Sequence, residues 1–180
     1  MSDDAAATLT DTGEAGPNET VPGGVEWRRG RYEISTDPAR LDIPGTAAFL
    51  GTTYWGKGRP ESIVRRSIEG SIAFGVYDDE EQVGFARVVT DRATFGWVCD
   101  VFIRDSHQGR GLGMWLMRCV LAHPELKDLR RWLLASTSAR GLYQRLGFTP
   151  LPAPERFMQI DTRASAAGVG GVTGSGDAPR

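Results

Sequence analysis

Three glycines within five residues mark the stretch of this sequence best suited to bind a ligand. Gly109, Gly111 and Gly113 stand at the point where one apolar run ends and a second, helix-like run begins. Glycine costs stability there, so bare backbone must serve a purpose. At a helix start several backbone N–H groups converge, and the helix dipole adds partial positive charge. The spacing predicts a phosphate or pyrophosphate site, to which Arg110 can add a charge-assisted hydrogen bond.

Two familiar phosphate-binding patterns fail at this stretch. A Walker loop requires Lys and then Ser or Thr after its last glycine, but Met114 and Trp115 follow Gly113. The dinucleotide fingerprint G-x-G-x-x-G would need its third glycine at position 114. The pattern that fits is Q-x-x-G-x-G, given by Gln108, Gly111 and Gly113.

Hydrophobic periodicity and turn residues predict the elements that position this stretch. We expect strands at 26–36, 71–78, 83–91, 94–105, 130–136 and 155–161, and helices at 41–51, 60–69, 111–122 and 139–148. A strand, a glycine turn, a helix and a strand in succession predict a right-handed crossover, so strands 94–103 and 131–135 should be parallel. The predicted fold is mixed α/β (α+β), with a mostly antiparallel, twisted sheet of about six or seven strands flanked by about four helices.

The composition of the chain argues against several classes of protein. The chain has 180 residues and a formal net charge of −2, so no basic field attracts nucleic acid. The apolar runs are too short to span a membrane, and the first 20 residues lack the features of a secretory signal. Cys99 and Cys119 make neither a disulfide framework nor a metal cluster, which favours a reducing cytoplasm. We expect a cytoplasmic protein with no nucleic-acid or membrane partner.

Both ends of the chain are expected to be disordered. Residues 1–24 are acidic and residues 164–180 are rich in Gly and Ala. Neither segment can bury enough apolar surface to offset its ordering entropy. The folded domain is therefore expected at 25–163.

Two motifs together resemble those of one enzyme family. The Q-x-x-G-x-G pattern after VFI resembles the pyrophosphate-binding motif of the GNAT superfamily of N-acetyltransferases. The stretch STSARGLYQRLGF resembles the later motif of that superfamily through Ala139, Tyr143, Gly147 and Phe148. The resemblance covers roughly residues 71–148 and is best to small stand-alone bacterial members.

The resemblance implies a reaction and a set of binding residues. The reaction is direct transfer of an acetyl group from acetyl-CoA to a primary amine of a small molecule, peptide or protein, without a metal. The parallel strands would splay at the cofactor site, where the backbone of Val101, Phe102 and Ile103 would pair with the pantetheine arm and one N–H group would polarise the thioester carbonyl. The pyrophosphate would be held by Gln108, Gly109, Arg110, Gly111, Leu112, Gly113 and Met114. Many relatives of this type form homodimers, so a dimer is possible.

Two side chains are candidates for proton transfer. Tyr143 is the candidate general acid, because a phenol is protonated at neutral pH and can protonate a departing thiolate; its alternative role is packing within a helix. Asp100 interrupts the apolar run WVCDVFI, where a carboxylate is costly without a partner. By alternation it lies on the face opposite Val101. It could act as a base, bind a cationic amine, or form a salt bridge to Arg87.

Several other residues remain open at this stage. Tyr54 and Trp55 either border the acceptor pocket or form a hydrophobic lid, and Trp97 and Phe85 could also face that pocket. His123 ends a predicted helix, where a cation suits the dipole. A non-catalytic acyl-CoA sensor on the same fold is the alternative function.

Overall fold

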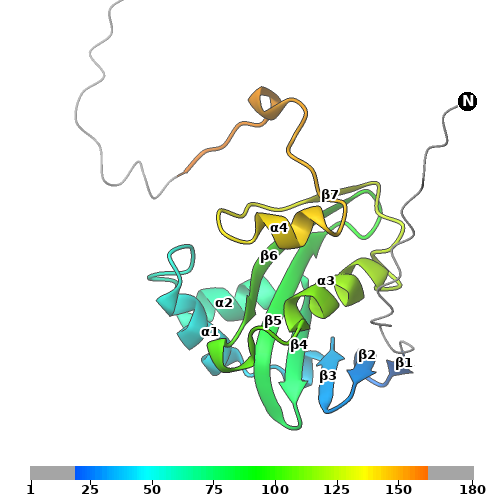
Figure 1. Cartoon of the computed structure of the whole chain (residues 1–180). Coiled ribbons are helices and arrows are strands. Elements are labelled where there is room, and N and C mark those ends of the chain that lie inside the picture. Colours follow the sequence, from blue (N-terminus) through cyan, green and yellow to red (C-terminus); the bar gives the residue numbers. More distant parts are fainter. Residues whose placement is uncertain (1–18, 162–180) are drawn as a thin grey trace, which may run out of the picture. The chain divides into compact units, whose positions relative to one another are not determined.

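Seven strands form one sheet whose spatial order follows the sequence (Figure 1). A computed structural model describes residues 19–161. The strands are β1 Glu19–Val21, β2 Gly24–Arg29, β3 Tyr32–Ser35, β4 Ile72–Asp78, β5 Glu81–Thr90, β6 Phe95–Ile103 and β7 Arg131–Leu133. The helices are α1 Ile43–Thr52, α2 Glu61–Glu69, α3 Leu112–Ala122 and α4 Arg140–Gln144. None of the helices in the described part is long and apolar enough to cross a membrane.

The predicted crossover is confirmed. The neighbours from β1 to β6 pair antiparallel, whereas β6 and β7 pair in parallel from Phe95 opposite Arg131 to Trp97 opposite Leu133. The glycine turn and α3 connect these two strands. A mostly antiparallel sheet with one parallel pair and four flanking helices is the fold class that the sequence predicts.

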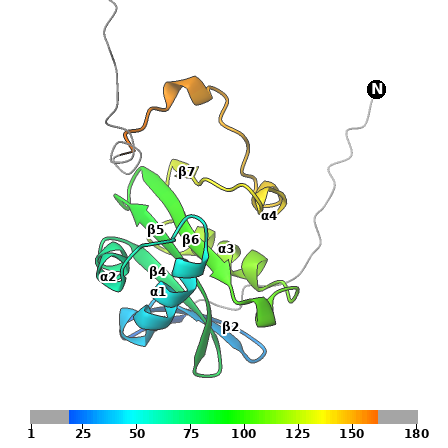
Figure 2. The ribbon, with the colours of Figure 1, turned by 90° about the vertical axis from the view of Figure 1, so that its left-hand side faces the viewer.

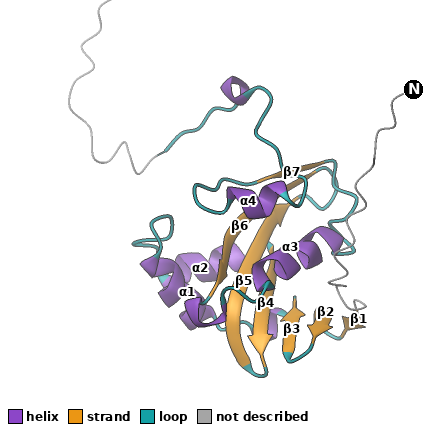
Figure 3. Cartoon of the chain, viewed as in Figure 1, coloured by secondary structure: helices purple, strands orange, loops and turns teal. Residues whose placement is uncertain are grey.

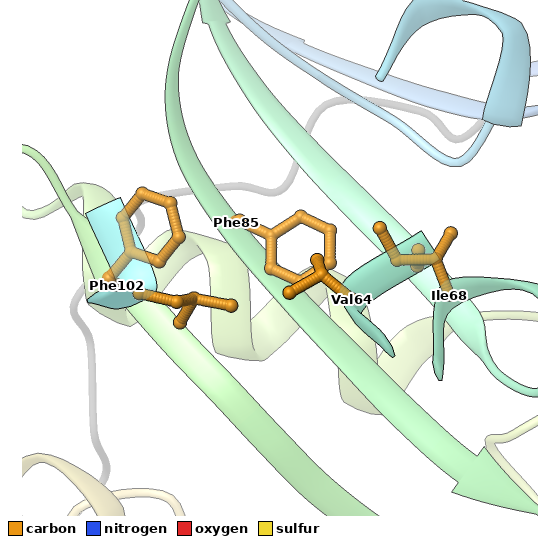
Figure 4. Packing of buried hydrophobic residues seen from close by; sticks show 6 residues of the cluster. Val64, Ile68, Phe85 and Phe102 are labelled. Carbon is orange, nitrogen blue, oxygen red and sulfur yellow. The ribbon is translucent and has the colours of Figure 1, made fainter. Parts of the chain in front are cut away.

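Helices cover both faces of the sheet. In Figure 2, α1 and α2 lie in front of the sheet and α3 lies behind it. The front core joins the two helices to the three central strands through Leu50, Val64, Ile68, Ala73, Phe85 and Phe102. Figure 4 shows the α2 side chains Val64 and Ile68 beside Phe85 of β5. Phe85 is fully buried in this core, so it does not face an open acceptor pocket, which the sequence had left possible.

The rear core rests on the apolar stripe of α3. Its predicted members Leu112, Trp115, Leu116, Cys119 and Val120 are all buried. His123, the residue after the helix, is also buried and contacts the ring of Phe74 edge-on. Burial lowers the pKa of His123, so the ring favours the neutral form. The expectation of a cation at this helix end is wrong, because the side chain turns into the core.

The expected single strand over 26–36 is wrong. It is a hairpin of β2 and β3, in which Arg29 pairs with Tyr32 around a two-residue turn. Gly30 has a φ of 60° there, a left-handed conformation that glycine adopts without steric cost. Strand β1, which pairs with β2, lies inside the segment 1–24 that was expected to be disordered.

Two further expectations near the C-terminus are also corrected. Strand β7 has three residues rather than the seven of 130–136, and it is partly exposed rather than buried. The chain forms two compact units, of which the second begins at Phe148. Its described part contains a 3-10 turn at Pro154–Arg156 and no strand at 155–161 (Figure 3). Pro150, Pro152 and Pro154 precede residues 155–161, and no ladder partner supports this stretch within the described residues. Residues 1–18 and 162–180 lie outside the described residues.

Gly84 sets the spacing between β5 and β6. A Cβ atom at this position would lie 2.6 Å from Ile103 Cδ1 and 2.9 Å from the carbonyl oxygen of Phe102. We expect Gly84→Ala to lower the free energy of unfolding by about 1–3 kcal/mol, because the added methyl overpacks a buried site. Urea unfolding measures this. Gly70→Ala is the matched control, since its Cβ would lie 3.7 Å from the carbonyl oxygen of Arg66, an ordinary van der Waals contact. Equal stability of the two variants would contradict the prediction.

Candidate functional site

Strand β6 carries a bulge at its centre. Phe85 pairs with Phe102, whereas Arg87 pairs with Cys99, so two β6 residues stand opposite one residue of β5. These two residues are Asp100 and Val101, and Asp100 has a φ of 51°. A bulge removes backbone groups from the regular ladder and re-aims the neighbouring side chains. The simple alternation assumed for Asp100 and Val101 therefore does not hold.

Beyond the bulge one edge of β6 is open. Strand β7 pairs only with residues 95–97 of β6, so within the described residues no strand continues along 98–103 on that edge. The predicted cofactor residues Val101, Phe102 and Ile103 lie on this open stretch. The ring of Phe102 stacks on Phe49 of α1 with centroids 3.9 Å apart, which fixes the end of the strand. An open edge with unpaired backbone groups can bind an extended chain as an added strand.

The glycine turn that follows is solvent exposed. Gly109 and Gly111 both have a φ of 73°, and Gly111 is the residue before α3. Both are exposed, and a Cβ at either position would meet no atom closer than 3.9 Å. These two glycines are therefore required by backbone conformation rather than by crowding. Since the first N–H groups of an α-helix lack intrahelical acceptors, the turn presents backbone donors to solvent.

Side chains hold the turn in place. Gln108 Nε2 donates to the carbonyl oxygen of Ile103 at 3.0 Å and to Asp105 Oδ1 at 2.8 Å. Arg110 donates to the hydroxyl of Tyr32 at 2.7 Å and to the carbonyl oxygen of Ser106 at 3.1 Å. Gln108 thus connects the turn to the end of β6. The Arg110 guanidinium donates to two uncharged oxygens.

Arg29 contacts the turn, and this contact was not predicted from the sequence. From β2, its guanidinium donates to the carbonyl oxygen of Arg110 at 3.2 Å and lies 4.7 Å from the ring centre of Trp115. Its position 81 residues earlier in the chain gave no local signal. Two arginines therefore stand at the exposed glycine turn.

Gly113 has a different task from the other two glycines. A Cβ at this position would lie 3.3 Å from Leu142 Cδ1, so its absence allows α4 to approach α3 closely. Helix α4 is preceded by Ser136. Its hydroxyl accepts the N–H of Ala139 at 3.1 Å and so supplies hydrogen bonding before the helix.

Tyr143 lies on α4 and is buried. Burial raises the pKa of Tyr143 above its usual value near 10, because a phenolate is poorly solvated there. The side chain therefore keeps its proton throughout the neutral range. A protonated phenol is thus carried by the helix that packs against the start of α3.

Asp100 lies between two arginines. Its Oδ2 accepts from Arg87 Nε at 2.6 Å, which is the salt bridge that the sequence offered as an alternative, and from Arg59 at 2.9 Å. Arg59 stands between α1 and α2 and was not singled out from the sequence. The Asp100 carboxylate is 5% exposed and the side chains of Arg87 and Arg59 are 12% and 23% exposed.

Exposed aromatic side chains lie on the two segments that carry Arg59 and Asp100. The Tyr54 and Trp55 rings pack edge-to-face with centroids 4.9 Å apart, and both are exposed. The Tyr54 hydroxyl is 2.6 Å from the hydroxyl of Thr137, which lies between β7 and α4. Trp97 of β6 is also exposed. The segment between α1 and α2 thus reaches the segment that leads into α4.

The surroundings of Cys99, Cys119 and His107 indicate structural roles for these three residues. Burial raises the pKa of Cys119 to about 12 and also raises that of Cys99, so both favour the thiol form. His107 Nε2 lies 3.3 Å from Asp78 Oδ2 and contacts the Tyr32 ring edge-on. These contacts anchor the glycine turn to the β4–β5 hairpin.

Comparison with known proteins identifies relatives of this chain. Residues 69–150 match the acetyltransferase (GNAT) domain family. A Gibberella zeae protein named as an acetyltransferase is 33% identical over 138 residues, which cover 65% of this chain and 78% of the relative. A crystal structure from Xanthomonas campestris, described as an acetyltransferase of the GNAT family, is 43% identical with a TM-score of 0.71, covering 74% of this chain and 95% of the other.

One further structure shares the fold at low sequence identity. It comes from Clostridium acetobutylicum and is described as an acetyltransferase with acetyl-CoA. It is 10% identical with a TM-score of 0.54 and covers 74% of this chain and 96% of the other.

Proposed function

Because this chain belongs to the GNAT family of acetyltransferases, we propose that it is an acetyl-CoA-dependent N-acetyltransferase that transfers the acetyl group directly to a primary amine. The observation that carries the proposal is the exposed glycine turn, whose left-handed Gly109 and Gly111 open α3 beside the free edge of β6. A carrier with a pyrophosphate and an extended thioester arm would satisfy both features. Acetyl-CoA is such a carrier, and the described Clostridium structure supports this choice.

The glycine turn would hold the pyrophosphate. Backbone N–H groups from Gly109 to Met114 would donate to phosphate oxygens, aided by the dipole of α3. Gln108 would act through the backbone, since its side chain bonds to Ile103 and Asp105. The open edge at Val101, Phe102 and Ile103 would receive the pantetheine arm.

Catalysis would use an N–H group of the bulge and the buried phenol. Acetyl-CoA supplies the acetyl group as an activated thioester. A backbone N–H at Val101 would polarise the carbonyl oxygen while the neutral amine forms the new C–N bond and the C–S bond breaks. Tyr143 would donate its proton to the departing thiolate. The amine nitrogen loses one proton to solvent as the amide forms, and Tyr143 regains one proton from solvent, so protons balance over the cycle.

Asp100 is proposed to act through charge, with the role of a base as the alternative. Its Oδ2 already accepts from two guanidinium groups, which suits a residue that positions Arg59 and Arg87. Asp100→Asn should lower turnover without unfolding the protein. Unchanged turnover would remove Asp100 from the mechanism.

The test is thiol release from acetyl-CoA with a panel of primary amines. Amine-dependent release, with a product mass increased by one acetyl group, is the expected result. Binding of acetyl-CoA without turnover on any amine would favour the acyl-CoA sensor. Failure to bind coenzyme A at all would refute both functions.

Arg29→Gln should weaken acetyl-CoA binding. The substitution removes a positive charge at the turn and the contact to the Arg110 carbonyl oxygen. We expect the KM for acetyl-CoA to rise about three- to tenfold, since a hydrogen bond to a charged group contributes about 1.5–3 kcal/mol when fully formed and less at an exposed site. Steady-state kinetics measure this.

The control for Arg29 is its neighbour on the same strand. Arg28 forms salt bridges with Glu26 and Glu33 instead of contacting the turn. Arg28→Gln makes the same charge change and should leave the KM for acetyl-CoA unchanged. Equal KM values in the two variants would contradict a role for Arg29 at the turn.

A further inference from the structure

An arginine–aromatic cluster stands beside the bulge of β6. Arg59 and Arg87 hold Asp100 there by salt bridges, and the exposed rings of Tyr54 and Trp97 belong to the two segments that carry Arg59 and Asp100. We propose that this cluster binds the amine acceptor, and that the acceptor is a small amino-carboxylate with an aromatic or branched apolar side chain. The proposal rests on the proposed N-acetyltransferase function and specifies its substrate class.

The charge of the cluster is not balanced. Two guanidinium groups share the single carboxylate oxygen Oδ2 of Asp100, which leaves a net charge of about +1 on the three side chains. Arg87 is 12% exposed and Arg59 is 23% exposed. Removing charge from water is costly unless it is paired. A bound carboxylate would supply the missing negative charge.

The geometry leaves donors for such a group. Asp100 takes one N–H from each guanidinium, and a guanidinium carries five N–H donors in a planar fork. Arg59 also approaches the carbonyl oxygen of Trp55 at 3.5 Å. The remaining N–H groups can donate to a second carboxylate, which matches the geometry of the fork.

Apolar surface lies on the same face of the sheet. Val89 follows Arg87 by two residues on β5, so their side chains share a face, and Val89 pairs directly with Trp97. Val89 and Trp97 are 39% and 37% exposed. Tyr54 is 68% exposed and stands on the same segment as Arg59. An apolar side chain of the acceptor would cover this exposed surface, whereas a polyamine would meet two like charges.

The cluster is continuous with the proposed transfer site. Asp100 directly precedes Val101, whose backbone N–H is proposed to polarise the thioester. The bond between the hydroxyls of Tyr54 and Thr137 connects the cluster to the segment that leads into α4 and Tyr143. An acceptor held by its carboxylate here would present its amine near the acetyl group.

Matched acceptors test the carboxylate requirement. The probes are L-phenylalanine, L-tryptophan and L-leucine, each compared with its own amide, together with phenethylamine, and the readout is thiol release from acetyl-CoA. We expect at least a tenfold higher kcat/KM for one or more of the amino acids than for its amide. Wild-type protein that acetylates amines but prefers the amides, phenethylamine or a polyamine such as spermidine would overturn the inference.

A charge variant tests the role of Arg59 in binding the acceptor carboxylate. Arg59→Gln should reduce the ratio of amino acid to amide toward one, with the KM for acetyl-CoA unchanged. Arg65→Gln is the matched control, because Arg65 is an exposed residue of α2 that pairs with Glu61, and its substitution makes the same charge change. Provided that the variants are folded and active, an unchanged ratio of amino acid to amide in Arg59→Gln would overturn the inference.

Direct binding separates the two proposals. Calorimetry measures binding of the same amino acids to the protein with coenzyme A present. Amino acids that bind wild-type protein but not Arg59→Gln, without acetyl transfer to any amine, would support the anion site and refute the proposed enzyme. Acetylation of other amines with neither binding nor acetylation of these amino acids would refute the substrate class alone.

Discussion

A Tyr143→Phe variant is expected to keep its affinity for acetyl-CoA and to lose about 100-fold in kcat. The substitution keeps the buried ring and removes the hydroxyl that would protonate the thiolate, and general acid catalysis typically contributes at least this factor. Thiol release at saturating acetyl-CoA measures kcat, and thermal unfolding checks the fold. An unchanged kcat would leave Tyr143 a packing residue of α4.

The matched control for this variant is Tyr77→Phe. Tyr77 is also buried, with a pKa raised by burial, and its hydroxyl has no hydrogen-bond partner among the residues that the structure describes. Its loss should leave kcat unchanged. Comparison of kcat in the two variants therefore distinguishes the effect of removing a buried hydroxyl from the effect of removing the general acid.

The pH dependence follows from the same group. Because burial raises the pKa of Tyr143 above 10, the proton needed for donation is present below that pH and is lost only above it. The kcat of wild-type protein should show no decline caused by Tyr143 between pH 7 and 9. A decline in this range that disappears in Tyr143→Phe would contradict the raised pKa.

The double variant Gly109→Ala/Gly111→Ala should raise the KM for acetyl-CoA more than tenfold. Both residues have a φ of 73°, where a Cβ costs about 1–2 kcal/mol per residue. Relief of that strain would turn the exposed N–H groups away from a common point. Titration with coenzyme A measures the affinity, and urea unfolding should show a loss of about 2–4 kcal/mol.

Gly51→Ala is the control for the glycine turn. Gly51 is in α1, where a Cβ meets no atom within 4 Å and helical backbone suits alanine. We expect a gain of about 0.5–1 kcal/mol and unchanged coenzyme A binding. Unchanged affinity in the double variant would refute the turn as the pyrophosphate site.

Local patterns explain which parts of the fold could be predicted. The stripe of α3 is a strong 3.6-residue period, and every member is buried. The parallel pairing of β6 and β7 follows from the order of elements and a general rule of handedness. The hairpin at Gly30 was missed because its flanking residues alternate like one continuous strand. The strand at 155–161 was wrong because its apolar residues indicate β-propensity but cannot supply a ladder partner.

The site could be predicted where its residues form a local pattern in the sequence. The glycine spacing predicted a turn before a helix, which the structure contains and leaves exposed, whereas anion binding by this turn stays a prediction. The salt bridge between Asp100 and Arg87, one of the alternatives that the sequence offered, is present. Arg59 and Arg29 were missed because tertiary contacts bring them in from 41 and 81 residues away. The bulge at Asp100 was equally hidden, since strand alternation predicts no extra residue.

The contact between Gly113 and Leu142 changes how saturation mutagenesis of the turn should be interpreted. A side chain at 113 would push on α4, so its phenotype would be a slower chemical step through a displaced Tyr143. Substitutions at 109 and 111 would instead appear as a cofactor-affinity defect. An interpretation that treats the three glycines as equivalent would combine two separable phenotypes. One is a change in kcat and the other is a change in the KM for acetyl-CoA.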